Sequence, residues 1–199
     1  MAETVESVTN LPPVRRFITK HNADGKSVHL ESTPQKFFPV PGQGGYARSY
    51  SVALPYELAD GVDIKAYTEP DKPTSWNSST IVTPNGVNFI IVDLQPGGAS
   101  FMHQTVSIDY SVVVLGEIEH VLDSGDTVTL KPGVSLSLVE YTVCNLNRTG
   151  QDHIIQRGTN HRWRNASKTE PARFVATTIA IEPFEVNGKP LEEKWDLTG

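Results

Sequence analysis

The sequence is poor in cysteine, in basic clusters and in long apolar runs. Cys144 is the single cysteine among 199 residues, which excludes a disulfide within the chain and favours a reducing compartment. The first residues lack the basic start and apolar core of a secretory signal, and no stretch approaches the ~18 apolar residues of a membrane span. We therefore expect a cytoplasmic protein that has no membrane partner.

The charge pattern also excludes classes of partner. The formal net charge is -6 and no Lys/Arg cluster is present, whereas proteins that bind nucleic acids usually carry a basic patch. A glycine-rich phosphate loop and a nucleotide fingerprint are both absent from the sequence. The expected partner is a small-molecule substrate, and nucleic acid is not expected.

Short β-rich segments make up most of the chain. The 15 glycines and 14 prolines punctuate runs rich in Val, Ile, Thr and aromatic residues, a pattern typical of sandwiches and barrels. Little helix is expected, with one turn within Glu69–Trp76, and Thr33–Gly45 is interpreted as a loop. The predicted strands are Val14–Thr19, Ser27–Glu31, Val87–Leu94, Ser111–Leu115, Glu117–Leu122, Thr127–Leu130, His153–Gln156 and Phe174–Ile181.

The polar residues of greatest chemical interest lie in two stretches. The first begins at the Gly97-Gly98 turn and contains His103, Thr105 and Asp109 before Gly116. Because alternate residues of a strand share a face, His103 and Thr105 can both point into a barrel. The second begins at Gly150 and contains Gln156, Gly158, His161 and Asn165.

These stretches resemble the two cupin motifs. In the first, Asp109 stands where cupins have a glutamate and Thr105 stands where they have a second histidine. In the second, Gln156 replaces a proline, while Gly158 and His161 match. The resemblance implies an all-β, jelly-roll-like cupin barrel, with the N-terminal strands extending one sheet.

A closer resemblance extends over most of the chain. The runs Met102–Tyr110 and Gln156–Asn165 are similar to those of small one-domain cupins found beside fungal secondary-metabolite genes. This closer resemblance implies a single domain over 1–199, with N-terminal strands and loops at 1–85, the barrel core at 86–183 and a C-terminal tail at 184–199. Cupins of this kind commonly pair through their N-terminal strands, so we expect a homodimer.

The candidate site consists of His103, Asp109 and His161. Two imidazoles and one carboxylate are the ligand set that holds Fe(II) with open positions, and Mn(II), Ni(II) or Zn(II) would also suit it. The alternatives are pocket histidines that bind no metal and an Asp109 that acts as a metal-free acid or base. His120 is interpreted simply as a strand residue.

Four further residues are predicted near the substrate: Gln104, Thr105, Gln156 and Trp163. Two of them have a structural alternative, a turn for Gln156 and a core position for Trp163.

Three functions fit this site. The first is a metal-dependent enzyme that tailors an oxygen-rich metabolite by lyase-type chemistry, namely decarboxylation, dehydration or isomerisation through an enolate. The second is an Fe(II)-dependent oxidoreductase or dioxygenase. The third is a metal-free acid/base isomerase or a non-catalytic binding barrel.

One segment interrupts the regular strand spacing. Removing Val134–Gln151 would join Gly133 to Asp152 as a tight Gly-Asp turn. Val-Ser at the start of this segment can be encoded by GTGAGT and Gln at its end by CAG, which are the nucleotides typical of intron boundaries. The segment is interpreted either as a retained intron or as a true loop that covers the pocket.

Overall fold

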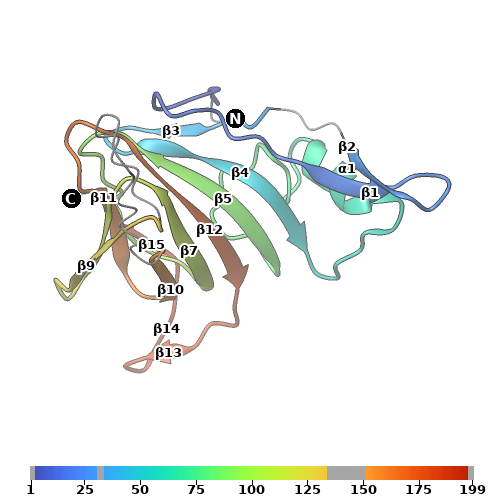
Figure 1. Cartoon of the computed structure of the whole chain (residues 1–199). Helices are drawn as coiled ribbons and strands as arrows, with labels where there is room; N and C mark the ends of the chain where they lie inside the picture. Colours follow the sequence, from blue (N-terminus) through green and yellow to red (C-terminus); the bar gives the residue numbers. More distant parts are fainter. Residues whose placement is uncertain (1–2, 31–33, 134–150, 197–199) are drawn as a thin grey trace, which may run out of the picture.

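Two antiparallel sheets face each other across the interior of the molecule (Figure 1). The computed structural model describes residues 3–30, 34–133 and 151–196. The six-stranded sheet has the order β10 (His153–Arg157), β7 (Ser107–Leu115), β12 (Ala172–Ala180), β5 (Gly86–Leu94), β4 (Gly44–Ala53) and β3 (Phe38–Val40). The five-stranded sheet has the order β15 (Lys194–Asp196), β6 (Met102–Gln104), β11 (His161–Asn165), β8 (Ile118–Leu122) and β9 (Thr127–Leu130). The predicted all-β jelly-roll-like barrel is confirmed.

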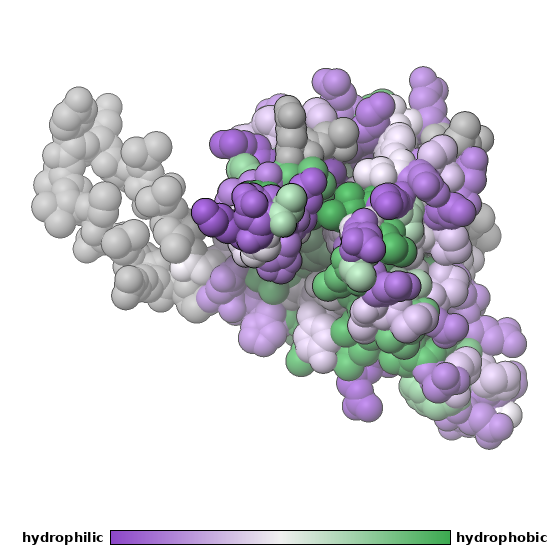
Figure 2. All heavy atoms as spheres, turned by 90° about the vertical axis from the view of Figure 1, so that its right-hand side faces the viewer, coloured by the Kyte–Doolittle hydropathy of each residue, from purple (hydrophilic) through white to green (hydrophobic). Residues whose placement is uncertain are grey.

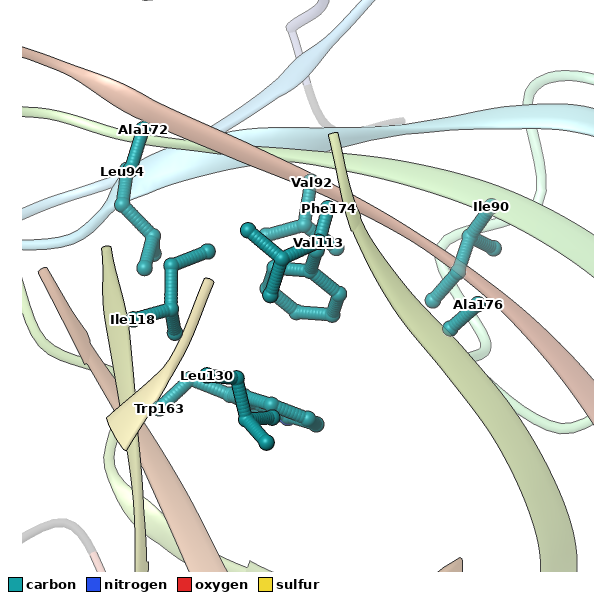
Figure 3. Packing of buried hydrophobic residues seen from close by; sticks show 10 residues of the cluster. All are labelled: Ile90, Val92, Leu94, Val113, Ile118, Leu130, Trp163, Ala172, Phe174 and Ala176. Atoms are coloured by element: carbon teal, nitrogen blue, oxygen red, sulfur yellow. The ribbon is translucent and has the colours of Figure 1, made fainter. Parts of the chain in front are cut away.

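The hydrophobic core fills one end of the space between the sheets. Leu94 and Ala172 are register partners on β5 and β12, and both are fully buried. Ile118 of the five-stranded sheet lies near them, and Trp163 packs with Leu130 below Val92, Val113 and Phe174 (Figure 3). Alternating inward side chains from both sheets therefore form one core.

The N-terminal part does extend the six-stranded sheet, but with other strands than those predicted. β3 and β4 provide the extension, whereas β1 (Ile18–His21) and β2 (Ser27–Leu30) form a separate two-stranded sheet that lies to the right in Figure 1. The prediction that Val14–Thr19 and Ser27–Glu31 add to the barrel sheet was therefore wrong.

The interpretation of Thr33–Gly45 as a loop was also partly wrong, because this range contains β3 and the start of β4. A Cβ on Gly44 would lie 2.2 Å from the carbonyl oxygen of Asp93, and one on Gly45 would lie 2.5 Å from that of Phe38. These glycines allow close approach of neighbouring strands, a role that sequence alone does not separate from a turn.

The one α-helix of the described residues is α1 (Val62–Thr68), not the predicted turn within Glu69–Trp76. Glu69 precedes Pro70 and has an extended backbone, with φ −72° and ψ 129°. The ring of a proline disfavours helical geometry in the residue before it, so the helix ends where it had been expected to begin. None of the described helices is long and apolar enough to cross a bilayer.

The residues on either side of the predicted insert are neighbours in space. The amide of Asp152 donates to the carbonyl of Lys131 at 3.0 Å, and a carboxylate oxygen of Asp152 accepts from the amide of Lys131 at 3.0 Å. Residues 134–150 lie outside the described part of the chain, so the origin of the insert stays a prediction. The homodimer also stays a prediction, which light scattering can test against the 21.8 kDa chain mass.

Candidate functional site

A cavity of about 430 Å³ lies between the sheets, beside the hydrophobic core. His103, Asp109 and His161 all line it, and so do Thr105 and Trp163. The sequence thus identified residues that share one cavity, although they come from three strands and both sheets.

His103 and His161 are direct neighbours on adjacent strands. They are Cα partners in the antiparallel pairing of β6 with β11, and their ring centroids are 4.3 Å apart. Nδ1 of His103 lies 2.9 Å from the carbonyl oxygen of Phe101, and Nδ1 of His161 lies 3.0 Å from that of Thr159. A carbonyl oxygen only accepts, so each Nδ1 carries the proton and each Nε2 keeps a free lone pair.

Burial keeps both imidazoles neutral. Desolvation lowers the pKa of His103, although the Phe101 carbonyl opposes it, and lowers the pKa of His161 well below its usual value. Repulsion from a charged His103 lowers the pKa of His161 further. The pair therefore presents two unprotonated Nε2 atoms at neutral pH, and these atoms can accept a proton or bind a metal ion.

Asp109 faces the cavity from the opposite sheet. Its Oδ1 accepts from the hydroxyl of Ser107 at 2.6 Å, and Ser107 is 2.9 Å from the hydroxyl of Thr105. Burial raises the pKa of Asp109 to about 6, although the hydrogen bond from Ser107 lowers it. A carboxyl group with this pKa can both give and take a proton near neutral pH.

The predicted ligand set does not form a ready metal shell. Within the described ranges, no three side chains of His, Cys, Asp or Glu are placed so that they could hold one ion. The two imidazoles would suit a metal, since each has a backbone partner at Nδ1, as ligating histidines usually do. Asp109 lies on the other sheet and bonds Ser107 instead. The arrangement does not fit a three-ligand site, and metal ligation stays a prediction.

The C-terminal strand β15 forms a wall of the site that sequence reasoning missed. Trp195 is the register partner of His103 and stacks on its ring, with centroids 4.7 Å apart and planes 3° from parallel. The indole Nε1 of Trp195 donates to Glu193 at 3.0 Å, and both residues line the cavity. A short polar segment near the end of the chain carries no motif that could have indicated this position.

His120 was also missed as a site residue. It lies on β8 as predicted, yet its exposed fraction is only 2%. Its ring stacks on that of His161, with centroids 5.1 Å apart. Its Nε2 lies 3.0 Å from Oε1 of Gln156, whose amide nitrogen donates to Thr159 Oγ1 at 2.7 Å. Gln156 therefore accepts at Oε1, and His120 must donate from Nε2.

The other predicted pocket residues divide between two places. Thr105 and Trp163 line the cavity, and Trp163 also belongs to the core, where it stacks on Phe174 with centroids 4.4 Å apart. Gln104 and Gln156 instead line a separate depression, together with His120. Gln104 donates to the carbonyl of Glu192 at 3.0 Å and so attaches the C-terminal segment to β6.

Comparison with known proteins identifies close relatives in fungi. Phomopsin biosynthesis cluster protein C′ of Diaporthe leptostromiformis is 39% identical over 186 residues, which cover 88% of this chain and 83% of the relative. A cupin-domain-containing oxidoreductase of Neurospora crassa is 32% identical over 180 residues, which cover 89% of this chain and 79% of the relative.

Other comparisons give weaker likenesses. No protein-family model matches the chain. A solved cupin-like protein of Thermotoga maritima is 14% identical, with a TM-score of 0.37, and the match covers 55% of this chain and 63% of that one. The two fungal relatives match most of the chain, including both motif stretches that supply the cavity. The chain therefore belongs to the fungal cupin-domain family that includes oxidoreductases and biosynthesis-cluster proteins.

Proposed function

We propose that this protein is an enzyme that moves protons on a small, oxygen-bearing metabolite, as a lyase or an isomerase that acts through an enolate. The observation that carries the proposal is the pairing of two kinds of group across one cavity. Asp109 has a pKa of about 6, and His103 and His161 offer unprotonated Nε2 atoms. Groups whose environments give them opposite proton affinities are the usual components of acid/base catalysis.

The proposed proton transfer runs from a substrate carbon to an imidazole. A free Nε2 of His161 or His103 can remove a proton from the carbon beside a carbonyl group. In a dehydration, protonated Asp109 then gives its proton to the departing hydroxyl group, which leaves as water as the C=C bond forms. In an isomerisation, Asp109 would stabilise the enolate oxygen by a hydrogen bond, and the imidazolium would return its proton to a different carbon. The hydroxyl groups of Thr105 and Ser107 keep the Asp109 carboxyl group in place through the chain of hydrogen bonds.

The names of the relatives favour a second candidate, an oxidoreductase, for which Fe(II) would be a suitable metal. Several relatives are named cupin-domain-containing oxidoreductases, including one from Neurospora crassa and one from Hypocrea virens. His103 and His161 would then bind the ion through Nε2, and the metal would supply redox chemistry. A metal-dependent lyase would use the same two imidazoles. For both of these metal-dependent enzymes, the described side chains provide no third ligand beside the two imidazoles.

The deciding experiment uses the metabolite that accumulates when the gene is deleted in its own organism. Purified protein is incubated with that compound in D₂O, and the product is analysed by mass spectrometry while dissolved oxygen is followed. Proton transfer predicts no oxygen consumption. An isomerisation should give a product of unchanged mass apart from deuterium at carbon, and a dehydration should give a product lighter by one water, in which no new C–H bond forms and no deuterium is required. Stoichiometric oxygen uptake would contradict the proposal and support the oxidoreductase.

A further inference from the structure

We infer that the cavity selects a neutral, ring-shaped, largely apolar molecule and rejects carboxylates and phosphates. This inference rests on the proposed function, because it names the substrate class of the same site. It comes from two independent properties of the cavity wall, its aromatic surfaces and the sign of its charged groups.

Flat aromatic surfaces form much of the wall. Trp163 and Phe174 stack on one side, with ring centroids 4.4 Å apart, and Trp195 covers His103 on another. Ile90 and Val92 add aliphatic surface to the wall. Figure 2 shows hydrophobic residues gathered in the middle of one face of the molecule, with hydrophilic residues around them. Such walls favour a planar, apolar ring, since stacking adds to the free energy of burial.

The charged groups that line the cavity are acidic. Asp109 and Glu193 are the carboxylates, and His103 and His161 each have a backbone carbonyl as the partner of Nδ1. No Lys or Arg side chain of the described residues lines this cavity. A bound anion would lose its hydration without gaining a counter-charge, and it would face carboxylates of the same sign.

The two buried arginines beside the barrel interior do not change this balance. The guanidinium of Arg48 donates to the carbonyl oxygens of Pro73 and Thr80. The guanidinium of Arg173 is paired with Asp93 through two hydrogen bonds, at 2.6 and 2.7 Å. Neither side chain lines the cavity, and each is already engaged with its own partners.

This selection narrows the chemistry. A decarboxylase must bind a carboxylate, for which the wall offers no cationic side chain among those described. Dehydration and isomerisation need only a carbonyl or hydroxyl group, which Asp109 and the imidazoles can reach by hydrogen bonding. Of the lyase-type reactions, the structure therefore favours the two that keep the substrate neutral.

The test compares 2-naphthamide with 2-naphthoate, which have the same ring and nearly the same shape but differ in charge. Binding to the purified full chain at pH 7.5 is followed by quenching of tryptophan fluorescence, because Trp163 and Trp195 line the cavity. We expect naphthamide to bind about tenfold or more tightly than naphthoate. Equal or tighter binding of naphthoate would overturn the inference.

Glu193→Gln provides the matched variant. Glutamine retains the oxygen that accepts from Trp195, and it removes one negative charge from the wall. Naphthoate should bind severalfold more tightly to this variant, while naphthamide should bind as before. Glu185→Gln, at an exposed position on β13 (Glu185–Val186), should change neither affinity. If Glu193→Gln leaves the ratio of the affinities unchanged, the charge argument fails.

These measurements separate the inference from the proposed function. They record affinity, whereas the D₂O experiment records turnover. Selective binding of naphthamide together with oxygen-consuming chemistry would refute the proton-transfer proposal and leave the substrate class standing. Turnover without oxygen uptake together with tight naphthoate binding would support the proton-transfer proposal and refute the substrate class.

Discussion

The same strands bury different chemistry at the two ends of the barrel. At one end, inward positions of β5 and β7 hold Leu94 and Val113, which belong to the hydrophobic core. At the other end, inward positions of β5, β7 and β12 hold Asn88, Asp109 and Thr178, of which the last two are register partners. The interior therefore changes from apolar to polar along β5 and β7, although each of them is one continuous strand.

The difference separates what stabilises the fold from what the protein needs for chemistry. Burial of Leu94 and Val113 is favourable in itself, because apolar surface leaves water. Thr178 and Asn88 at the polar end both donate to the carbonyl of Ile81, at 2.8 and 2.9 Å. Asp109 alone among these residues occupies a position that disfavours its own charge. Such a group is expected at a functional site, where stability is exchanged for reactivity.

The largest expected effect is that of Asp109→Asn on turnover. The amide cannot give or take a proton, so kcat should fall by about 10²–10⁴-fold, the usual contribution of a general acid or base. The free energy of unfolding at pH 8 should not decrease, because the buried charge has been removed. Mass-spectrometric turnover and urea denaturation measure the two quantities. Asp24→Asn, in an exposed turn, should change neither. Full activity of Asp109→Asn would show that the polar end of the barrel does not use Asp109 as an acid or base.

Ile118→Ala tests the opposite end. Ile118 is fully buried in the core, so its truncation should lower the free energy of unfolding by about 2–5 kcal/mol. Naphthamide affinity, measured where the variant is folded, should stay close to that of the wild type. Val128→Ala, at a position 49% exposed on β9, should cost less than about 0.5 kcal/mol. A loss of affinity as large as that for a cavity residue would show that the two ends are not independent.

The pH dependence of stability should carry the signature of Asp109. The pKa of its carboxyl group rises from 3.8 to about 6 on folding, so the folded state binds the proton more tightly than the unfolded state. Its contribution is therefore most favourable below pH 4, decreases as the pH rises to 6 and is constant above that. The decrease is on the order of 3 kcal/mol.

The histidines act in the opposite direction, because folding lowers the pKa of His103, His120 and His161. Their contribution to stability is lost as the pH falls below 6.5. The difference in unfolding free energy between wild type and Asp109→Asn cancels them, so this difference should show the Asp109 slope alone. A flat difference between pH 4 and pH 6 would mean that Asp109 is not desolvated.

His120→Ala should have the smallest effect. It should change both quantities that the comparison separates, the stability of the fold and the pH dependence of turnover. The substitution leaves Oε1 of Gln156 buried without its donor, which should cost about 1–3 kcal/mol of stability. Because His120 stacks on His161, the pH profile of turnover should also shift. His120→Gln can still donate to Gln156 and should restore part of both properties. His153→Ala, exposed on β10, is the control. An unchanged pH profile would reduce His120 to a structural residue.

Sequence reasoning was most reliable where local pattern is decisive. Runs rich in Val, Ile, Thr and aromatic residues, bounded by turn residues, located β5, β7, β8, β9, β10 and β12 to within a few residues. It failed for β4, because Gly44 and Gly45 have the composition of a turn. It also placed helix after Pro70 instead of before it. The role of the two glycines depends on which strands lie beside them, whereas the effect of Pro70 on Glu69 is local.

The sequence by itself was enough to predict a β-barrel and to bring His103, Asp109 and His161 together as its candidate site, because motif spacing and runs of strand-forming residues are local properties. Only the tertiary structure decided what surrounds them. Trp195 lies far from the motifs along the chain, and His120 lies just beyond the first of them. The pairing of strands brings Trp195 against His103 and His120 against His161. The sign of the charge on the cavity wall and the raised pKa of Asp109 also depend on the tertiary structure. The fold brings the charged side chains of the wall together, and it buries Asp109.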